Sequence, residues 1–193
     1  MSLKGWQETL VTAQADGPAR SSFTTAVTIL PDACRWKEPA GEVANAGKQY
    51  EVVATGRISN VVTAQPTFTF ELRMGPTSNI VAFTTGALLC STTVHTNVPW
   101  KLWLLLTCRS VGATAAATFI GQGEVTSQAF VSSGATADSV NTHTDLMAPN
   151  TNPAVGTGWD STVDNYMDLF AACSASAAGN AITCTQYSLR RLN

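Results

Sequence analysis

The fold is predicted from the stretch Pro66-Thr67-Phe68-Thr69-Phe70-Glu71-Leu72-Arg73-Met74, which alternates apolar and polar residues without a break. A second stretch repeats the alternation with more apolar side chains, Trp100-Lys101-Leu102-Trp103-Leu104-Leu105-Leu106-Thr107-Cys108-Arg109. Successive side chains of a strand point to opposite faces, so this period predicts two strands that each place one face on a core. Trp103 and Leu105 lie on the other face of the second stretch, which favours a central strand or one whose outer face contacts another protein.

Shorter patterns of the same kind predict further strands, and these cover residues 10–14, 23–30, 48–59, 80–84, 112–130, 142–147, 168–175 and 181–189. We expect bulges at Gly56 and at Gly121-Gln122-Gly123, and loops at 92–99 and over most of 132–162. No stretch predicts a convincing helix. Many short strands at regular spacing are typical of a sandwich or barrel. We expect an N-terminal arm or strand pair at 1–30, followed by one all-β domain at 31–193.

Composition limits the classes of function. Charged residues make up only 12% of the chain, the net charge is −2 and the pI is about 5.6. A protein that binds nucleic acid through its phosphates usually carries a basic patch, and this chain shows none. The first residues lack the apolar run of a signal peptide, and the longest apolar run is too short to span a bilayer. We therefore expect synthesis in a cytoplasm, with neither nucleic acid nor membrane as a partner.

Five cysteines stand at positions 34, 90, 108, 173 and 184, and no two of them have the spacing of a metal-binding pair. Scattered cysteines with apolar neighbours predict reduced, buried thiols. Cys173 and Cys184 lie on the two arms of a predicted hairpin, so a disulfide between them stays an alternative.

Candidate catalytic and metal-binding groups are sparse. His95 and His143 each lack a second ligand at metal-binding spacing, apart from Asp145 two residues after His143. Asp160, Asp164 and Asp168 could offer oxygens to Ca²⁺, but turn and strand-start roles fit them better. No serine stands in a Gly-x-Ser-x-Gly context, and Gly121-Gln122-Gly123 lacks the third glycine of a phosphate loop. We predict no catalytic residue, no metal and no cofactor, so the chain is not expected to be an enzyme.

The order of features resembles a known family, and five segments carry the resemblance. These are Gly5-Trp6-Gln7-Glu8-Thr9-Leu10, then Leu30-Pro31 with Gly47 to Ser59, then Pro66 to Met74, then Pro99 to Gly112, and finally Gly121-Gln122-Gly123-Glu124 with the closing hairpin. The chain is similar, from about residue 5 to 190, to a family of jelly-roll structural proteins from tailed bacteriophages. The resemblance implies a jelly-roll β-sandwich and a component of the virion, and it brings no reactive residue with it.

Two functions follow as expectations. The preferred one is a capsid decoration or cement protein that binds the outer surface of the phage head and stabilises the shell. Its partners would be the major capsid protein and further copies of itself, as a homotrimer or dimer. The alternative is a tail- or fibre-associated module that binds a receptor or glycan through exposed tryptophans. The interface candidates are Trp6, Leu10, Phe23, Trp103, Leu105 and Trp159, with Trp103 and Trp159 as the best candidates for an exposed site.

Overall fold

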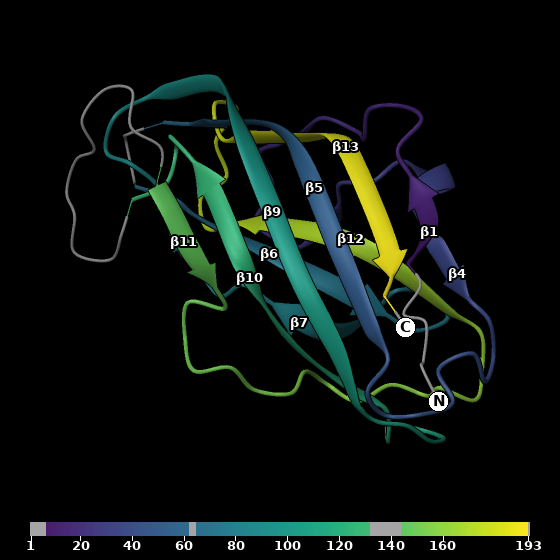
Figure 1. The fold of residues 1–193 in the computed structure, drawn as a ribbon. Helices are drawn as coiled ribbons and strands as arrows, with labels where there is room; N and C mark the ends of the chain where they lie inside the picture. The colour runs from purple at the N-terminus through teal and green to yellow at the C-terminus, as the bar shows by residue number, and fades with distance from the viewer. Residues whose placement is uncertain (1–6, 62–64, 132–143, 193) are drawn as a thin grey trace.

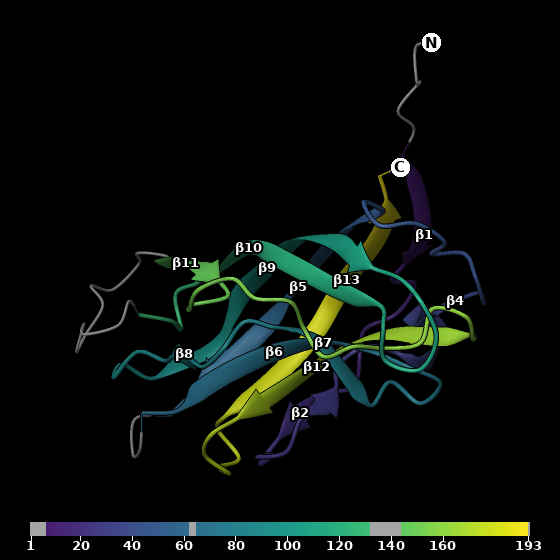
Figure 2. The same cartoon turned by 90° about the horizontal axis from the view of Figure 1, so that it is seen from below.

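The protein is an all-β sandwich of two antiparallel sheets, as the computed structural model shows for residues 7–61, 65–131 and 144–192. The larger sheet has the strand order β1-β13-β5-β9-β10-β11, and β2 also pairs with β13. The bounds are β1 Glu8–Thr12, β2 Arg20–Ser21, β5 Gln49–Asn60, β9 His95–Ser110, β10 Thr118–Ser127, β11 Thr144–Ala148 and β13 Ala181–Arg191. Figure 1 looks onto this sheet, and β11 and β1 lie at its opposite edges (Figure 2).

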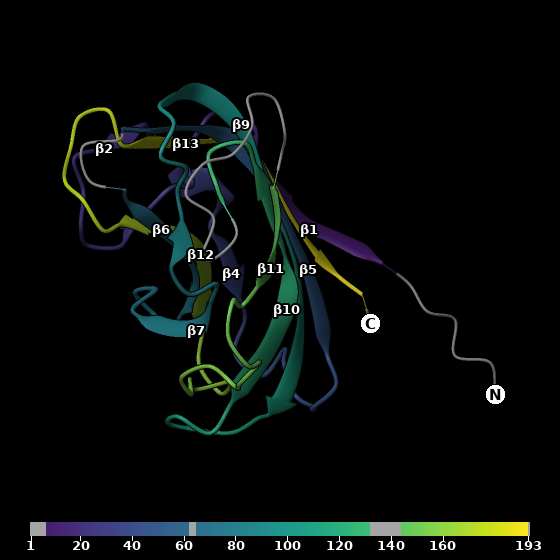
Figure 3. The same cartoon turned by 90° about the vertical axis from the view of Figure 1, so that its left-hand side faces the viewer.

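The smaller sheet lies behind the larger one, and Figure 3 shows the two layers edge-on. Its strand order is β3-β12-β6-β7, with β4 beside β12 and β8 beside β6. The bounds are β3 Val27–Thr28, β4 Trp36–Glu38, β6 Thr67–Met74, β7 Ile80–Thr84, β8 Leu88–Leu89 and β12 Asn165–Cys173. The described residues contain one short 3₁₀ turn, Asp32–Cys34, and no α-helix. The all-β sandwich prediction is confirmed, and the jelly-roll connectivity stays a prediction.

The core forms where the alternating strands place their apolar faces between the sheets. Phe68, Phe70, Leu72 and Met74 of β6 are fully buried, as are the inward residues of β9 from Leu102 to Leu106. The Phe70 and Trp100 rings lie 5.0 Å apart between centroids and join the two layers. All five cysteines are buried and free, so the predicted reduced thiols are confirmed and Cys173 and Cys184 form no disulfide.

Residues 7–30 of the expected N-terminal arm or strand pair form strands that belong to the two sheets. Strands β1 and β2 pair with β13, and β3 pairs with β12. Phe23 packs edge-on against Phe68, with 6.2 Å between ring centroids, and Ile29 and Leu30 belong to the core. These residues bury apolar surface that the rest of the sandwich would otherwise expose, so they are part of the same domain. Residues 1–6 of the expected arm lie outside the described residues.

Three local expectations are wrong for identifiable reasons. β9 begins at His95 instead of Trp100, because residues 95–99 pair with the end of β5. Residues 113–116 form a turn before β10, where the backbone N–H of Thr114 donates to Asp160 Oδ2 at 2.7 Å.

The bulge expected at Gly121-Gln122-Gly123 is absent from the structure of β10. Gly121 and Gly123 stand in a strand whose register with β9 is regular, and an added Cβ at Gly123 would lie 1.9 Å from the Trp103 carbonyl oxygen. Those glycines therefore allow close approach between strands without forming a bulge.

The bulge expected at Gly56 lies across from it. The irregularity falls in β13, between Cys184 and Gln186, which pair with Gly56 and Thr55. An added Cβ at Gly56 would lie 1.9 Å from the Thr183 carbonyl oxygen. A glycine is therefore required at position 56, because the backbone of the bulged strand β13 leaves no room for a Cβ there.

A buried carboxyl in β4 gives the fold a specific pH dependence. Glu38 is 1% exposed and accepts hydrogen bonds from Trp36 Nε1 at 2.7 Å and from the Tyr50 hydroxyl at 2.9 Å. Burial raises the pKa of Glu38 above its ordinary value, while the two donors and the nearby Arg191 act in the opposite direction. A raised pKa means that the folded state favours the protonated form, so this contribution to stability is present in acid and is lost as pH rises through the raised pKa.

We expect Glu38→Gln to flatten this part of the pH dependence. The amide oxygen can still accept from Trp36, and the amide nitrogen can donate to the Tyr50 hydroxyl, so the buried groups stay paired. Chemical denaturation between pH 4.5 and neutrality would show a smaller loss of unfolding free energy in the variant than in the wild type. Glu124→Gln, at an exposed ion pair, is the control. An unchanged pH slope, with lower stability throughout, would contradict the assignment.

Candidate functional site

The outer face of the larger sheet presents an ordered set of side chains over five strands. Opposite residues of neighbouring strands form a central row across the sheet, which runs Ser188, Val53, Trp103, Glu124 and Met147. A row on one side contains Arg190, Glu51, Leu105 and Gln122, and a row on the other side contains Gln186, Thr55, Lys101, Thr126 and Asp145. We call this surface the Trp103 face.

Apolar side chains occupy the centre of the Trp103 face. Trp103, Leu105 and Val53 are each only partly buried, and Met147 is 68% exposed. Trp103, Leu105 and Met147 line a common shallow hollow with the polar side chains of Gln122 and Glu124. In a sheet that faces water, the outer positions are usually polar. Apolar groups at the middle of a sheet with a polar surround are typical of a surface that contacts another molecule.

Hydrogen bonds hold the aromatic centre in place. Trp103 Nε1 donates to Glu51 Oε1 at 2.9 Å, and Arg190 Nη1 donates to Glu51 Oε2 at 3.2 Å. The Glu51 carboxylate therefore restrains the orientation of the Trp103 indole, and Arg190 balances the charge of that carboxylate. A side chain restrained in this way loses less conformational entropy when a partner covers it.

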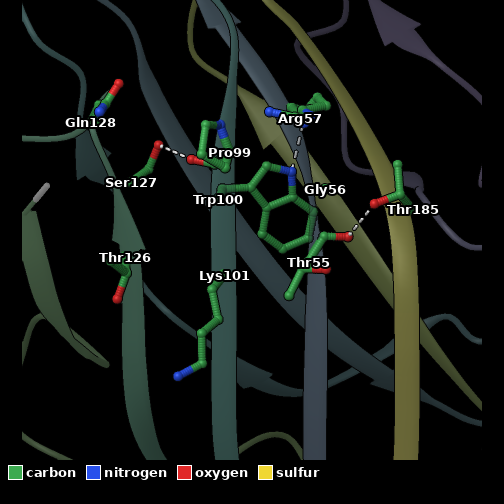
Figure 4. A pocket seen from close by; sticks show the side chains of 10 residues that line it. All are labelled: Thr55, Gly56, Arg57, Pro99, Trp100, Lys101, Thr126, Ser127, Gln128 and Thr185. Atoms are coloured by element: carbon green, nitrogen blue, oxygen red, sulfur yellow. Dashed lines mark hydrogen bonds between the residues drawn. The ribbon is translucent and has the colours of Figure 1, made fainter. Parts of the chain in front are cut away.

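A groove of about 480 Å³ adjoins the apolar centre along β9 (Figure 4). It is lined by Thr55, Gly56, Arg57, Pro99, Trp100, Lys101, Thr126, Ser127, Gln128 and Thr185. Trp100 Nε1 donates to the Arg57 and Thr183 carbonyl oxygens, each at 3.2 Å, and Ser127 Oγ donates to the Pro99 carbonyl at 2.9 Å. These bonds join β5, β9, β10 and β13, so the groove has rigid walls.

Four of the buried cysteines have thiols whose pKa values lie above the ordinary value. Burial raises the pKa of the Cys184 thiol to about 12, and it also raises the pKa values of Cys90, Cys108 and Cys173. The thiolate is the reactive form of cysteine, so none of these four thiols is activated as a nucleophile. His95 lies at the start of β9, and His143 lies outside the described residues.

The three aspartates considered for Ca²⁺ serve as anchors for other parts of the chain. Asp160 Oδ1 accepts from the Thr162 hydroxyl at 2.6 Å, and this bond, with those from the backbone N–H groups of Thr114 and Thr162, lowers the pKa of Asp160. Asp164 pairs with Lys37 Nζ at 2.6 Å. Asp168 is buried and lies 2.9 Å from Arg35 Nε. Over the described ranges, no three His, Cys, Asp or Glu side chains are grouped closely enough to hold a metal ion.

The structure separates the predicted interface residues into two groups. Trp103 and Leu105 meet at the centre of the Trp103 face, and Leu10 is partly buried in β1 against the core. Phe23 and Trp159 are buried in the chain's own core, so neither is available to a partner. The expectation that Trp159 is exposed is therefore wrong, because its indole stacks on Phe119 with 5.3 Å between ring centroids. Trp6 lies outside the described residues.

Sequence reasoning missed Val53, Met147 and Arg57 as parts of this surface. Val53 has a signal in the sequence, because it falls on the face opposite Tyr50, Val52 and Ala54 in the predicted strand. Met147 does not, because its outward position depends on the pairing of β11 with β10. Arg57 becomes notable only once the groove beside it is known.

Comparison with known proteins adds no family. No family model matches the chain, and no curated protein matches it. Among solved structures it is similar to the CBM2 module of the evolved Dit of Lactobacillus casei BL23 phage J-1. That match has 8% identity, covers 99% of this chain and 98% of the other, and has a TM-score of 0.36. A TM-score this low does not establish a shared fold, so neither fold nor function follows from it. The described part of the chain contains no helix long and apolar enough to span a bilayer.

Proposed function

We propose that this chain is a non-enzymatic structural protein of a tailed-phage virion that docks on another virion protein through the Trp103 face. The resemblance along most of the sequence supports the virion role. The observation that carries the docking role is the apolar centre formed by Val53, Trp103, Leu105 and Met147, on the outside of a sheet whose other face already covers the core.

The arrangement of this face supports a protein partner. Protein interfaces have an apolar centre in which Trp and Met are enriched, surrounded by a polar rim that stays in contact with water. The Trp103 face has this anatomy, with Glu51, Arg190, Lys101 and Glu124 as charged members of its rim. These four charges form two ion pairs within the face, Glu51 with Arg190 and Lys101 with Glu124, which lowers the cost of bringing a neutral surface against them.

The preferred site on the virion is the outer surface of the head, with the major capsid protein as partner. A decoration protein stabilises a shell because rupture must also break the contacts that it makes. Burial of apolar area contributes about 25 cal/mol per Å², and the many copies on a symmetric shell add an avidity effect. Self-association as a homotrimer or dimer belongs to the same proposal.

A second candidate function is glycan or receptor binding at the tail or a fibre. The observation in its favour is the partly exposed Trp103, whose ring has hydrogen-bonding neighbours in Glu51, Gln122 and Glu124. A flat aromatic side chain with polar groups around it can stack on a sugar ring and bind its hydroxyls. Of the two tryptophans expected to serve this function, Trp103 remains a candidate and Trp159 is buried.

Fractionation of the virion tests the proposal. Purified particles are separated into heads and tails, and each fraction is probed with an antibody against this chain. Particles assembled without the chain are then tested for binding of the purified protein and for resistance to heat. Recovery on heads, with a lower rupture temperature when the chain is missing, supports the decoration function. Recovery on tails, with binding on a glycan array, supports the second candidate. Absence from both fractions would overturn the virion role.

A further inference from the structure

Within the part of the chain that the structure describes, Arg57 stands at the groove beside the Trp103 face and has no acidic partner. Among the lysines and arginines of the described residues, seven form ion pairs with carboxylates, and they are Arg35, Lys37, Lys48, Arg73, Lys101, Arg190 and Arg191. Arg20, Arg57 and Arg109 do not, and Arg20 Nε donates instead to the Thr28 carbonyl at 3.0 Å. Arg57 is exposed and stands at the groove, whereas Arg109 is exposed on the same face without lining it.

The pairing of the strands explains why space is open next to Arg57. Its neighbour across β9 is Pro99, whose short ring leaves room where a longer side chain would fill the sheet surface. Thr55 lies two residues away on the same face of β5, and Gln128 contributes from the turn that follows β10. Figure 4 shows Arg57 and Lys101 at opposite ends of the labelled residues. Lys101 Nζ lies 3.2 Å from Glu124, so the unbalanced positive charge belongs to Arg57.

We propose that this groove receives a single acidic side chain of the virion protein that covers the Trp103 face, with Arg57 as its cationic partner. The proposal rests on the proposed function for the identity of the partner. An arginine binds a carboxylate with two parallel hydrogen bonds, and the Thr55 hydroxyl and Gln128 amide offer further donors.

The other charges on the face favour one carboxylate over a polyanion. Glu51 on β5, Glu124 on β10 and Asp145 on β11 all lie on the Trp103 face, one in each of its three rows. A chain with many negative charges would meet these acids when it followed the face, and like charges repel. An isolated acid within a mostly apolar and neutral contact would reach Arg57 without that penalty.

A small probe tests the anion site without any virion protein. Sodium acetate is titrated into isotope-labelled protein, and backbone amide signals are followed by NMR, with sodium chloride at equal ionic strength as the reference. We expect saturable shifts centred on Thr55, Arg57 and Gln128 that are lost in Arg57→Gln and retained in Arg109→Gln. If the shifts are absent, or equal in the two variants, the anion site is overturned.

The second measurement uses particles assembled without this chain. Arg57→Gln is expected to weaken binding of the protein to these particles by roughly tenfold or more, while Arg109→Gln binds like the wild type. Full binding by Arg57→Gln, when Trp103→Asp does not bind, would overturn the role of the groove and leave the docking face intact. Wild-type protein that does not bind to the particles would overturn the proposed function instead. Tighter binding to polygalacturonate than to acetate, through Arg57, would overturn the choice of a single acidic side chain in favour of an acidic polysaccharide.

Discussion

Replacement of Trp103 by aspartate is expected to abolish docking on particles while the sandwich stays folded. The indole lies at the centre of the apolar patch, where interface substitutions have their largest effects, commonly 2 kcal/mol or more. An aspartate there would also lie opposite Glu124 and diagonal to Glu51, and like charges repel. Because Trp103 is on the outer face, its loss leaves the core strands intact. Co-sedimentation of the variant with particles assembled without the chain measures the effect.

Two controls separate loss of docking from loss of structure. Thermal unfolding of Trp103→Asp should stay within a few degrees of the wild type, since surface changes rarely cost much stability. Thr107→Asp adds the same charge on the same strand, outside the apolar patch, and should bind with nearly wild-type affinity. Equal binding by Trp103→Asp and the wild type would remove this face from the proposed function.

Trp159→Ala is expected to destabilise the fold by about 3–5 kcal/mol. Trp159 is 1% exposed, stacks on Phe119, and exchanges backbone hydrogen bonds with Ala117 in both directions. Removal of the indole leaves a cavity between the sheets that the neighbouring strands cannot close. Chemical denaturation gives the change in the free energy of unfolding.

Trp159→Phe is the matched variant for this site. Trp159 Nε1 is buried without a hydrogen-bond partner, so phenylalanine removes an unsatisfied donor and keeps a ring against Phe119. We expect it to cost much less than alanine. If both variants were equally destabilised, the indole nitrogen would have a role that the packing alone does not explain. Retention of full stability by Trp159→Ala would contradict the burial.

The strands were predictable wherever alternation was long and regular. The stretch Pro66–Met74 became β6 with one residue of difference, and Ile80–Thr84 became β7 without change. The short strands β2, β4 and β8 were missed, because two or three residues are too few to show an alternation of apolar and polar side chains. Pairing between distant strands, such as β1 with β13, has no local pattern that would indicate it.

Only part of the candidate site could be predicted from the sequence, because some exposures depend on pairing between distant segments. Trp103 and Leu105 break the polar face of an alternating strand, so their exposure could be inferred from period alone. Trp159 stands in a segment rich in Gly, Ser and Thr, where a lone aromatic residue gives no sign of being inward. Its burial depends on the bridge to Ala117, more than forty residues earlier in the chain.

The pairing of β13 with both β1 and β5 has a consequence for biosynthesis. The larger sheet cannot close until the last eleven residues of the sandwich, Ala181–Arg191, have left the ribosome. Until then Tyr50, Val52 and Ala54 of the nascent polypeptide lack one of their two neighbouring strands. Because contacts between distant segments form slowly, pairing of β13 with β1 and β5 is expected to be a late step in folding.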